Sequence, residues 1–232
     1  MAPSGGIIFV LGGYLLVLLL LGLWGSRDSK NLAGYYLAGK KLPSWVIAFS
    51  STSTGESAWL LLGLTGMGYM VGFHALWVVL GEFLGVLCAW KLVARPFKEY
   101  TDRYDSITVA DYLETRFSDK GHILRIIGTI IILSMVTAYT AAQLTASGKV
   151  FNSFLGTDYA TGVTIGAVVI LFYTSVGGFK AVAYSDLLQG VLMFGCLLLL
   201  PITGVMASGG WSPFIENLRV EDPGLLTLMG SG

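Results

Sequence analysis

Apolar residues along this chain fall into blocks of about twenty, the length that crosses a bilayer as a helix, and polar residues gather between the blocks. The blocks lack the alternation of apolar and polar positions that membrane β-strands show, so they predict membrane-spanning α-helices. Six spans are predicted, at residues 7–24, 44–69, 72–90, 126–150, 159–173 and 186–206. A long amphipathic segment, residues 91–125, follows the third span and is expected to lie at the cytoplasmic membrane surface.

The second predicted span contains a polar run that is badly suited to lipid. Residues 50–57 are Ser, Thr and Gly, with one carboxylate, Glu56. Unpaired polar groups are costly in hydrocarbon, so such a run is tolerated only inside protein or beside a cavity. Small polar residues also let a helix unwind, and the freed carbonyls can then hold a cation. We therefore predict a broken helix near Ser53–Ser57. The alternative is a packing face whose hydroxyls bond back to the helix.

Composition places the chain in a membrane and excludes several functions. Hydrophobic residues make up 54% and charged residues 12% of the chain, against about 25% charged residues in soluble domains. The mean hydropathy is +0.73, so the lipid bilayer is the expected partner. The formal net charge is zero, which argues against nucleic acid as a partner. His74 and His122 lack metal-ligand spacing, and no Ser-His-Asp set is apparent, so the chain is not expected to be an enzyme.

The basic residues predict the orientation in the membrane. If the N-terminus lies outside, twelve of the fourteen Lys and Arg residues fall in loops that face the cytoplasm; Lys149 and Arg219 are the exceptions. The positive-inside rule favours this arrangement. We therefore expect a multi-pass protein of the cell inner (plasma) membrane.

Several stretches resemble the sodium:solute symporter family, and most closely its sodium/proline symporter branch. Residues 173–189 are similar to the family's loop-and-helix signature. The other similar stretches are Gly39-Lys40-Lys41-Leu42, Ser57-Ala58-Trp59-Leu60-Leu61-Leu62-Gly63-Leu64, Trp90-Lys91-Leu92-Val93-Ala94, Asp111-Tyr112-Leu113, Arg116-Phe117 and Ile123-Leu124-Arg125-Ile126-Ile127. They follow one another in order along most of the chain.

The resemblance implies an all-α membrane protein of the LeuT-type inverted-repeat fold, which has five plus five helices and one extra helix in front. The first span would be that preceding helix, and the second to sixth spans the first repeat of five helices. The second repeat is absent from these residues and is expected in the same or another chain. The last residues, 226–232, end abruptly, as in a fragment, and we expect the 232 residues alone not to transport.

The resemblance also implies a function and a set of site residues. The function is sodium-coupled symport (uptake) of a small polar solute, with proline, another amino acid or a small organic acid as the candidates and Na⁺ as the coupling ion. The carried-over positions are Ser53 and Glu56 for sodium, Glu56, Ser57, Ala58, Trp59 and Tyr139 for the solute, and Asp186 and Lys40 for a second cation site or cytoplasmic gating.

One departure from the proline carriers lies at the centre of the polar run. Those carriers have Asp where Gly55 stands and an apolar residue where Glu56 stands, so the carboxylate has moved by one position, or about 100° on a regular helix. We assign the work of the missing acid to the side chain of Glu56.

Some of the candidate site residues also have a structural interpretation. Asp186 could cap the sixth span, and Tyr139 and Trp59 could be packing residues. For the whole chain, the alternative function is a non-transporting membrane sensory or binding module, or an inactive half-transporter fragment.

Overall fold

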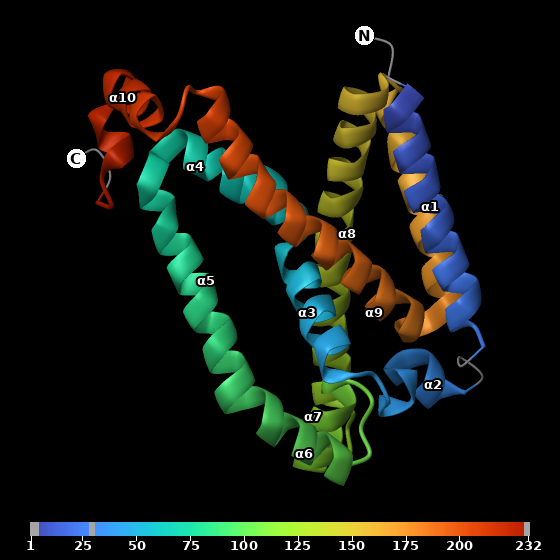
Figure 1. Ribbon diagram of the computed structural model, residues 1–232. Helices are drawn as coiled ribbons and strands as arrows, with labels where there is room; N and C mark the ends of the chain where they lie inside the picture. Colours follow the sequence, from blue (N-terminus) through green and yellow to red (C-terminus); the bar gives the residue numbers. More distant parts are fainter. Residues whose placement is uncertain (1–4, 28–30, 230–232) are drawn as a thin grey trace. The chain divides into compact units, whose positions relative to one another are not determined.

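The structure, a computed structural model, describes residues 5–27 and 31–229, without the side chains of Ser57, Ala58 and Leu61. Within these residues it consists of helices and short connections, with no strand (Figure 1). The α-helices are α1 (Gly5–Gly25), α2 (Leu32–Leu37), α3 (Ser44–Ala58), α4 (Thr65–Val71), α5 (Leu76–Cys88), α6 (Arg95–Arg103), α7 (Val109–Phe117), α8 (Ile123–Leu155), α9 (Tyr159–Ala207) and α10 (Trp211–Glu221). The shorter turns are η1 (Ala38–Lys40), η3 (Gly72–Ala75) and η5 (Pro223–Leu226), which are 3₁₀, and η2 (Trp59–Leu64) and η4 (Ala89–Ala94), which are π-helical.

Four stretches of the described helices are long and apolar enough to cross a membrane. They are Gly5–Gly25, Leu62–Arg103, Ile123–Leu155 and Tyr159–Ala207. All the predicted spans except the second lie within these stretches, and the second carries the polar run that lowers its hydropathy. The chain is therefore a multi-pass membrane protein, and its division into six spans stays a prediction.

Helix α9 is bent sharply in its middle. At 49 residues, a straight helix would be about 70 Å long, more than twice the hydrocarbon thickness of about 30 Å. Gly178 has φ 60° and ψ −163°, which is not helical. Only glycine adopts this backbone conformation readily, because a Cβ would clash with the backbone. The fifth and sixth predicted spans both lie within α9, and the kink at Gly178 separates them into two helical segments.

The predicted break near Ser53–Ser57 was wrong in its position. Helix α3 continues in α geometry to Ala58, and the departure from it is the π-helical turn η2, Trp59–Leu64. Two hydroxyls on α3 bond back to the preceding turn: Thr52 Oγ1 donates to the Ala48 carbonyl at 3.0 Å and Thr54 Oγ1 to the Ser50 carbonyl at 2.9 Å. Back-bonding satisfies these hydroxyls within the helix, so the polar run stays helical.

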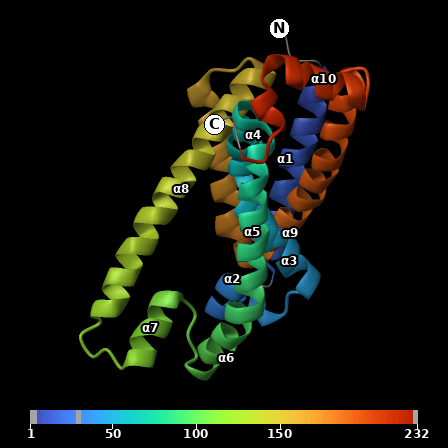
Figure 2. The same ribbon diagram turned by 90° about the vertical axis from the view of Figure 1, so that its left-hand side faces the viewer.

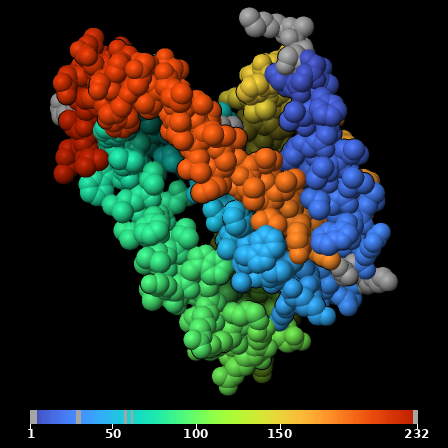
Figure 3. Space-filling model, in the orientation of Figure 1, coloured from blue at the N-terminus to red at the C-terminus, as the bar shows by residue number. Residues whose placement is uncertain are grey.

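The chain forms two compact units, and the first consists of Met1–Gly55 and Arg103–Gly190. In this unit α1 packs closely on α9. A Cβ added at Gly22 would lie 2.8 Å from the Cα of Tyr173, and Figure 3 shows α1 in blue against the orange part of α9. Small residues at helix contacts allow such close approach in membrane proteins, where packing replaces the hydrophobic effect.

The second unit consists of Glu56–Asp102 and Val191–Gly232. Here η5 folds over the start of η3, and Figure 2 shows α10 and the following turn at the end of α4. A Cβ at Gly72, where φ is 57°, would lie 2.1 Å from the Leu225 carbonyl oxygen, so this contact requires glycine. The Leu228 carbonyl accepts a hydrogen bond from Trp77 Nε1 at 2.8 Å and lies 3.0 Å from His74 Nδ1.

Polar contacts hold α7 at the start of α8, within the predicted amphipathic segment. Thr108 caps α7, and its side chain accepts a hydrogen bond from the Asp111 amide at 3.1 Å. Glu114 contacts His122 and accepts a hydrogen bond from Arg125 Nη1 at 3.0 Å. These contacts fix a surface helix by charge and capping rather than by a large apolar core.

Candidate functional site

A stripe of hydroxyls on α3 faces α9 in the first unit. Ser50, Ser53 and Thr54 are spaced three and four residues apart, so they lie on one face of the helix. Ser50 Oγ donates to Asp186 Oδ2 at 2.7 Å, and Thr54 Oγ1 lies 3.5 Å from the same oxygen. Ser53 Oγ donates to the backbone carbonyl of Asp186 at 2.8 Å. The stripe therefore surrounds Asp186 with oxygen atoms.

Close packing buries the two serines of this cluster. Ser50 and Ser53 are only 8% and 7% exposed. A Cβ at Gly190 would lie 2.5 Å from Ser53 Oγ, so glycine at this position lets α3 and α9 approach each other. A partly buried carboxyl group loses part of its hydration and needs hydrogen bonds in its place. The hydroxyls of α3 supply such bonds to Asp186, which is half-buried.

Helix α8 contributes to the same site through Tyr139. Its hydroxyl donates to the Thr54 carbonyl at 2.8 Å, and the residue is 44% exposed. Tyr139 therefore joins α8 to the polar stripe of α3 and stays partly accessible.

Helix α1 reaches the neighbouring turn of α9. Gln189 Nε2 donates to the Tyr14 hydroxyl at 2.7 Å. This bond lies one turn beyond Asp186. Helices α1, α3 and α8 therefore contribute polar groups near this part of α9.

Glu56 and Trp59 belong to the second unit. Glu56 is partly buried, and its Oε2 atom is enclosed without a hydrogen-bond partner among the described residues. Trp59 begins the π-helical turn, and its ring lies so close to Gly63 that a Cβ there would come within 2.3 Å of Cε3.

The predicted site residues lie in different parts of the described structure. Ser53, Tyr139 and Asp186 meet in one cluster. Lys40 is exposed at the end of η1, and its gating role stays a prediction. The side chains of Ser57 and Ala58 lie outside the described residues. Asp186 lies inside α9, well beyond the kink, so the alternative that it caps a helix is wrong.

Sequence reasoning missed Ser50 and Thr54 as partners of Asp186. A signal was available: Ser50, Ser53 and Thr54 occur at the i, i+3, i+4 spacing of one helix face inside an apolar block. The spacing predicts a polar stripe, although it does not say which acid the stripe faces.

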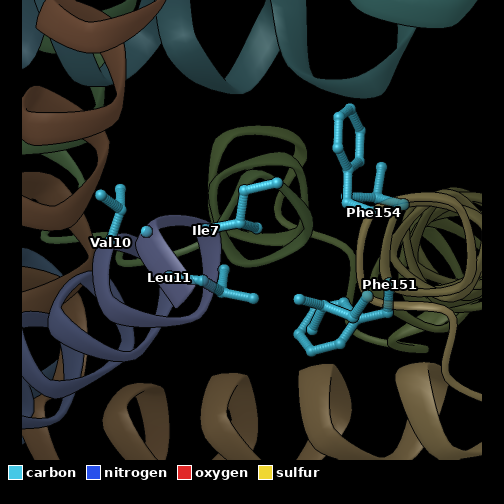
Figure 4. Close-up of a pocket in the computed structure, with 8 residues that line it drawn as sticks. Ile7, Val10, Leu11, Phe151 and Phe154 are labelled. Atoms are coloured by element: carbon cyan, nitrogen blue, oxygen red, sulfur yellow. The ribbon is translucent and has the colours of Figure 1, made fainter. Parts of the chain in front are cut away.

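An apolar cavity of about 440 Å³ opens between α1 and α8 and is not suited to a polar solute. Figure 4 shows Ile7, Val10 and Leu11 on one side and Phe151 and Phe154 on the other. None of its lining side chains offers a hydrogen-bond partner, so a polar solute would lose its hydration there without compensation.

Comparison with known proteins places this architecture among membrane transporters. The sodium:solute symporter family matches residues 35–230. The chain therefore belongs to the sodium:solute symporter family, whose members are symporters and not enzymes.

Two curated relatives carry names that mention proline. The chain is 37% identical over 212 residues to the high-affinity proline transporter PutP of Bacillus subtilis, covering 91% of this chain and 45% of that protein. It is 34% identical over 219 residues to the sodium/proline symporter of Staphylococcus aureus, covering 94% of this chain and 43% of that protein. The chain thus spans less than half the length of these relatives.

A solved structure shares the fold. It is the substrate-bound, outward-open state of a Na⁺-coupled sialic acid symporter, with a TM-score of 0.78 at 21% identity. The match covers 92% of this chain and 43% of that one. The fold is therefore LeuT-like, as expected, and the assignment of helices to repeats stays a prediction.

Proposed function

We propose that this chain is part of a sodium-coupled symporter that takes up a small polar solute, with proline as the first candidate. The observation that carries the proposal is the oxygen cluster between α3 and α9, in which the buried Ser50 and Ser53 donate hydrogen bonds to the side chain and the backbone carbonyl of Asp186. Hard cations such as Na⁺ prefer oxygen ligands. The names of the two relatives support proline as the solute.

Within the LeuT-type fold, α1 is the preceding helix and the elements from α3 to the second half of α9 form the first repeat of five helices. The second repeat lies in the same or another chain. The N-terminus faces outside the plasma membrane, since the basic loops then face the cytoplasm.

Two sodium positions follow from the oxygen atoms. Asp186, Ser50 and Thr54 offer a carboxylate and two hydroxyls, which suit a second cation site. The principal site would use backbone carbonyls of Ser53 and Glu56. The nearest departure from α geometry is the π-helical turn η2, which begins at Trp59, three residues after Glu56. Lys40, at the cytoplasmic mouth, would act in gating.

The solute would meet Glu56, Ser57, Ala58, Trp59 and Tyr139. The enclosed Oε2 atom of Glu56 lacks a partner among the described residues, so it can receive the ammonium or imino group of an amino acid. Tyr139 is 44% exposed beside the polar stripe, and Trp59 is also 44% exposed. Exposed aromatic faces suit the apolar part of such a solute.

A non-transporting sensory or binding module, or an inactive half-transporter, is not favoured. The relatives that match most of the chain are named as a transporter and a symporter, and no contact in the described residues points to signalling.

The test is proline uptake into proteoliposomes that contain the complete protein to which this chain belongs. Uptake is expected to require an inward sodium gradient. Asp186→Asn should raise the sodium concentration for half-maximal uptake about tenfold or more, because a neutral amide binds Na⁺ more weakly than the Asp186 carboxylate does.

The matched control is Asp158→Asn. Asp158 accepts a hydrogen bond from the Thr161 amide at 3.3 Å at the exposed start of α9, so its loss should leave the sodium dependence unchanged. Equal proline uptake with and without sodium would contradict symport. An unchanged sodium dependence in a folded Asp186→Asn protein would remove Asp186 from the cation site. Sodium binding without any proline binding would assign another solute.

A further inference from the structure

A polar cavity of about 450 Å³ lies in the first unit, away from the Asp186 cluster. One wall is the segment around η1, which contributes Gly39 and Lys41, and the other is α9 just beyond its kink, which contributes Lys180 and Tyr184. Its described lining residues include two lysines and no acid. The cavity is therefore a place where anions are favoured over cations.

Aromatic contacts hold the α9 wall. Lys180 Nζ lies 3.8 Å from the ring centroid of Trp24, a cation–π contact. Tyr184 packs edge-on against the same ring, with centroids 5.0 Å apart and planes at 85°. Lys180 and Tyr184 are thus oriented side by side by one residue of α1.

Hydrogen bonds and backbone turns build the opposite wall. Asn31 caps α2 by accepting from the Gly34 amide at 2.6 Å, and the Tyr35 hydroxyl donates to the Ser175 carbonyl at 3.1 Å. The kink at Gly178 removes helical donors from carbonyls of the preceding turn, and Tyr35 replaces one of them.

The turn that carries Lys41 into the cavity is held in an unfavourable conformation. Three successive residues, Ala38, Gly39 and Lys40, have φ of 48°, 62° and 57°. Left-handed backbone is uncommon for residues other than glycine, and it persists where the surrounding structure imposes it. This turn places Lys41 on the cavity wall opposite Lys180.

Two tryptophans in the elements around the cavity indicate a position at a membrane surface. The cavity is near the end of α1 that carries Trp24 and the start of α3 that carries Trp45, and Trp45 is 56% exposed. Tryptophan is typical of the boundary between hydrocarbon and headgroups. The loop from Arg27 to Lys41 has four basic residues and one acid, Asp28, so it would attract anionic lipid.

We propose that this cavity binds the phosphate of an anionic phospholipid headgroup. Lys41 and Lys180 neutralise the phosphate, the Tyr184 hydroxyl is within the same wall to donate to it, and Leu42 and Pro43 offer apolar lining for the glycerol end. The bound headgroup joins the η1 turn to the second half of α9. It therefore steadies the kink at Gly178, and this role does not depend on which solute the protein carries.

The test is lipid binding to the purified complete protein in detergent. The probes are short-chain phosphatidylglycerol, short-chain phosphatidylcholine and inorganic phosphate, with retained lipid counted by native mass spectrometry and binding followed by tryptophan fluorescence. Phosphatidylglycerol is expected to bind, and to raise the unfolding temperature. The double variant Lys41→Gln, Lys180→Gln should weaken that binding about twenty-five-fold, since each lysine near an anionic lipid contributes about fivefold.

Two further variants make the result interpretable. Lys91→Gln with Lys120→Gln removes the same charge from exposed positions outside the cavity and should change the affinity less than about twofold. Lys41→Arg with Lys180→Arg keeps both charges and should retain binding if the cavity is intact. Equal losses in the cavity and control variants, equal binding of phosphatidylcholine, or loss of binding in the arginine variant would overturn the proposal. Inorganic phosphate that binds as tightly as the lipid would also overturn it, in favour of a site for free phosphate.

Discussion

Hydroxyl groups on α3 have two different roles, and their positions decide which. Thr52 is exposed and bonds back to its own helix. Ser50 and Ser53 are buried against α9 and bond to Asp186. An apolar helix can thus carry a run of Ser and Thr when most of the hydroxyls find acceptors, as those of Ser50, Thr52, Ser53 and Thr54 do, either one turn back or on the neighbouring helix.

Glu56 is the residue for which a mutation is most informative about the solute. One of its carboxylate oxygens is enclosed without a hydrogen-bond partner among the described residues, which is costly unless a ligand completes it. Glu56→Gln is therefore expected to weaken sodium-dependent proline binding a hundredfold or more, the effect of removing one member of a buried charge pair, which costs about 3–5 kcal/mol. The measurement is proline binding titrated against sodium in the complete reconstituted protein.

Glu82→Gln is the matched control, since it removes the same charge from the same unit in α5, and a smaller loss is expected. The double change Gly55→Asp, Glu56→Met should restore part of the sodium dependence. If Glu56→Gln leaves both affinity and sodium dependence unchanged, the carboxylate is structural and its assignment to the solute is wrong.

Glu114 predicts how the α7–α8 contact responds to pH. Its hydrogen bond with His122, together with one from Arg125, lowers the pKa of Glu114 below its ordinary 4.5. Because the folded pKa is lower than the unfolded one, the carboxylate stabilises the contact fully above pH 4.5. That stabilisation is lost as the pH falls from 4.5 through the folded pKa. Hydrogen exchange of α7, corrected for its intrinsic pH dependence, should therefore speed up on acidification in this window.

In the Glu114→Gln variant, the amide hydrogens of α7 should exchange faster at neutral pH than in the parent protein. Acidification through the same pH window should increase their exchange rate little further. Glu99→Gln is the control: Glu99 pairs with Arg95 on the exposed face of α6, so its loss should leave the pH response of α7 as in the parent protein. An identical acid response in Glu114→Gln would show that other groups set it.

Among the helices, α9 depends most on a single backbone position. Its two halves meet at Gly178, whose φ and ψ only glycine adopts without strain. The kink also brings the carbonyl of Ser175 to the hydroxyl of Tyr35 and directs Lys180 toward Trp24. One residue therefore positions the Asp186 half of the helix and the lysine cavity together.

Gly178→Ala is expected to destabilise the protein by about 1–3 kcal/mol, the usual cost of a residue forced into a glycine-only conformation. Thermal unfolding of the purified protein in detergent measures the change. Gly195→Ala is the control on the same helix, because a Cβ there meets nothing within 4 Å; it should leave the stability unchanged or raise it by up to about 1 kcal/mol. Equal stability of the two variants would mean that the kink relaxes without cost.

The molecule as a whole is built by small residues and polar contacts more than by a buried apolar core. Large apolar side chains stay exposed on the long helices, among them Ile130 at 59% and Leu133 at 61% on α8. Such surfaces suit lipid or further protein. The chain covers 45% and 43% of the two proline-related relatives. In the symporter proposed above, the second repeat would pack on such faces. Proline uptake by the complete protein tests this arrangement.

Local composition was enough to predict the class of the protein. The long apolar blocks predicted an all-α membrane protein, and the described structure is helical with four stretches able to cross a membrane. Hydropathy is a local property that adds along a helix, so it can be read without knowing what the helix contacts. The family was also recognisable, because its motifs are short stretches in order along the chain.

Which polar groups pair with one another was decided only by the tertiary structure. Ser50 and Asp186 lie 136 residues apart, yet their side chains form a 2.7 Å hydrogen bond. The polar run predicted a broken helix near Ser53–Ser57, whereas back-bonded hydroxyls kept α3 intact to Ala58 and the irregular turn followed at Trp59. A serine in a membrane helix can bond to its own turn or to another helix. The choice depends on which helix packs alongside, and residues such as Gly190 decide how closely it can approach.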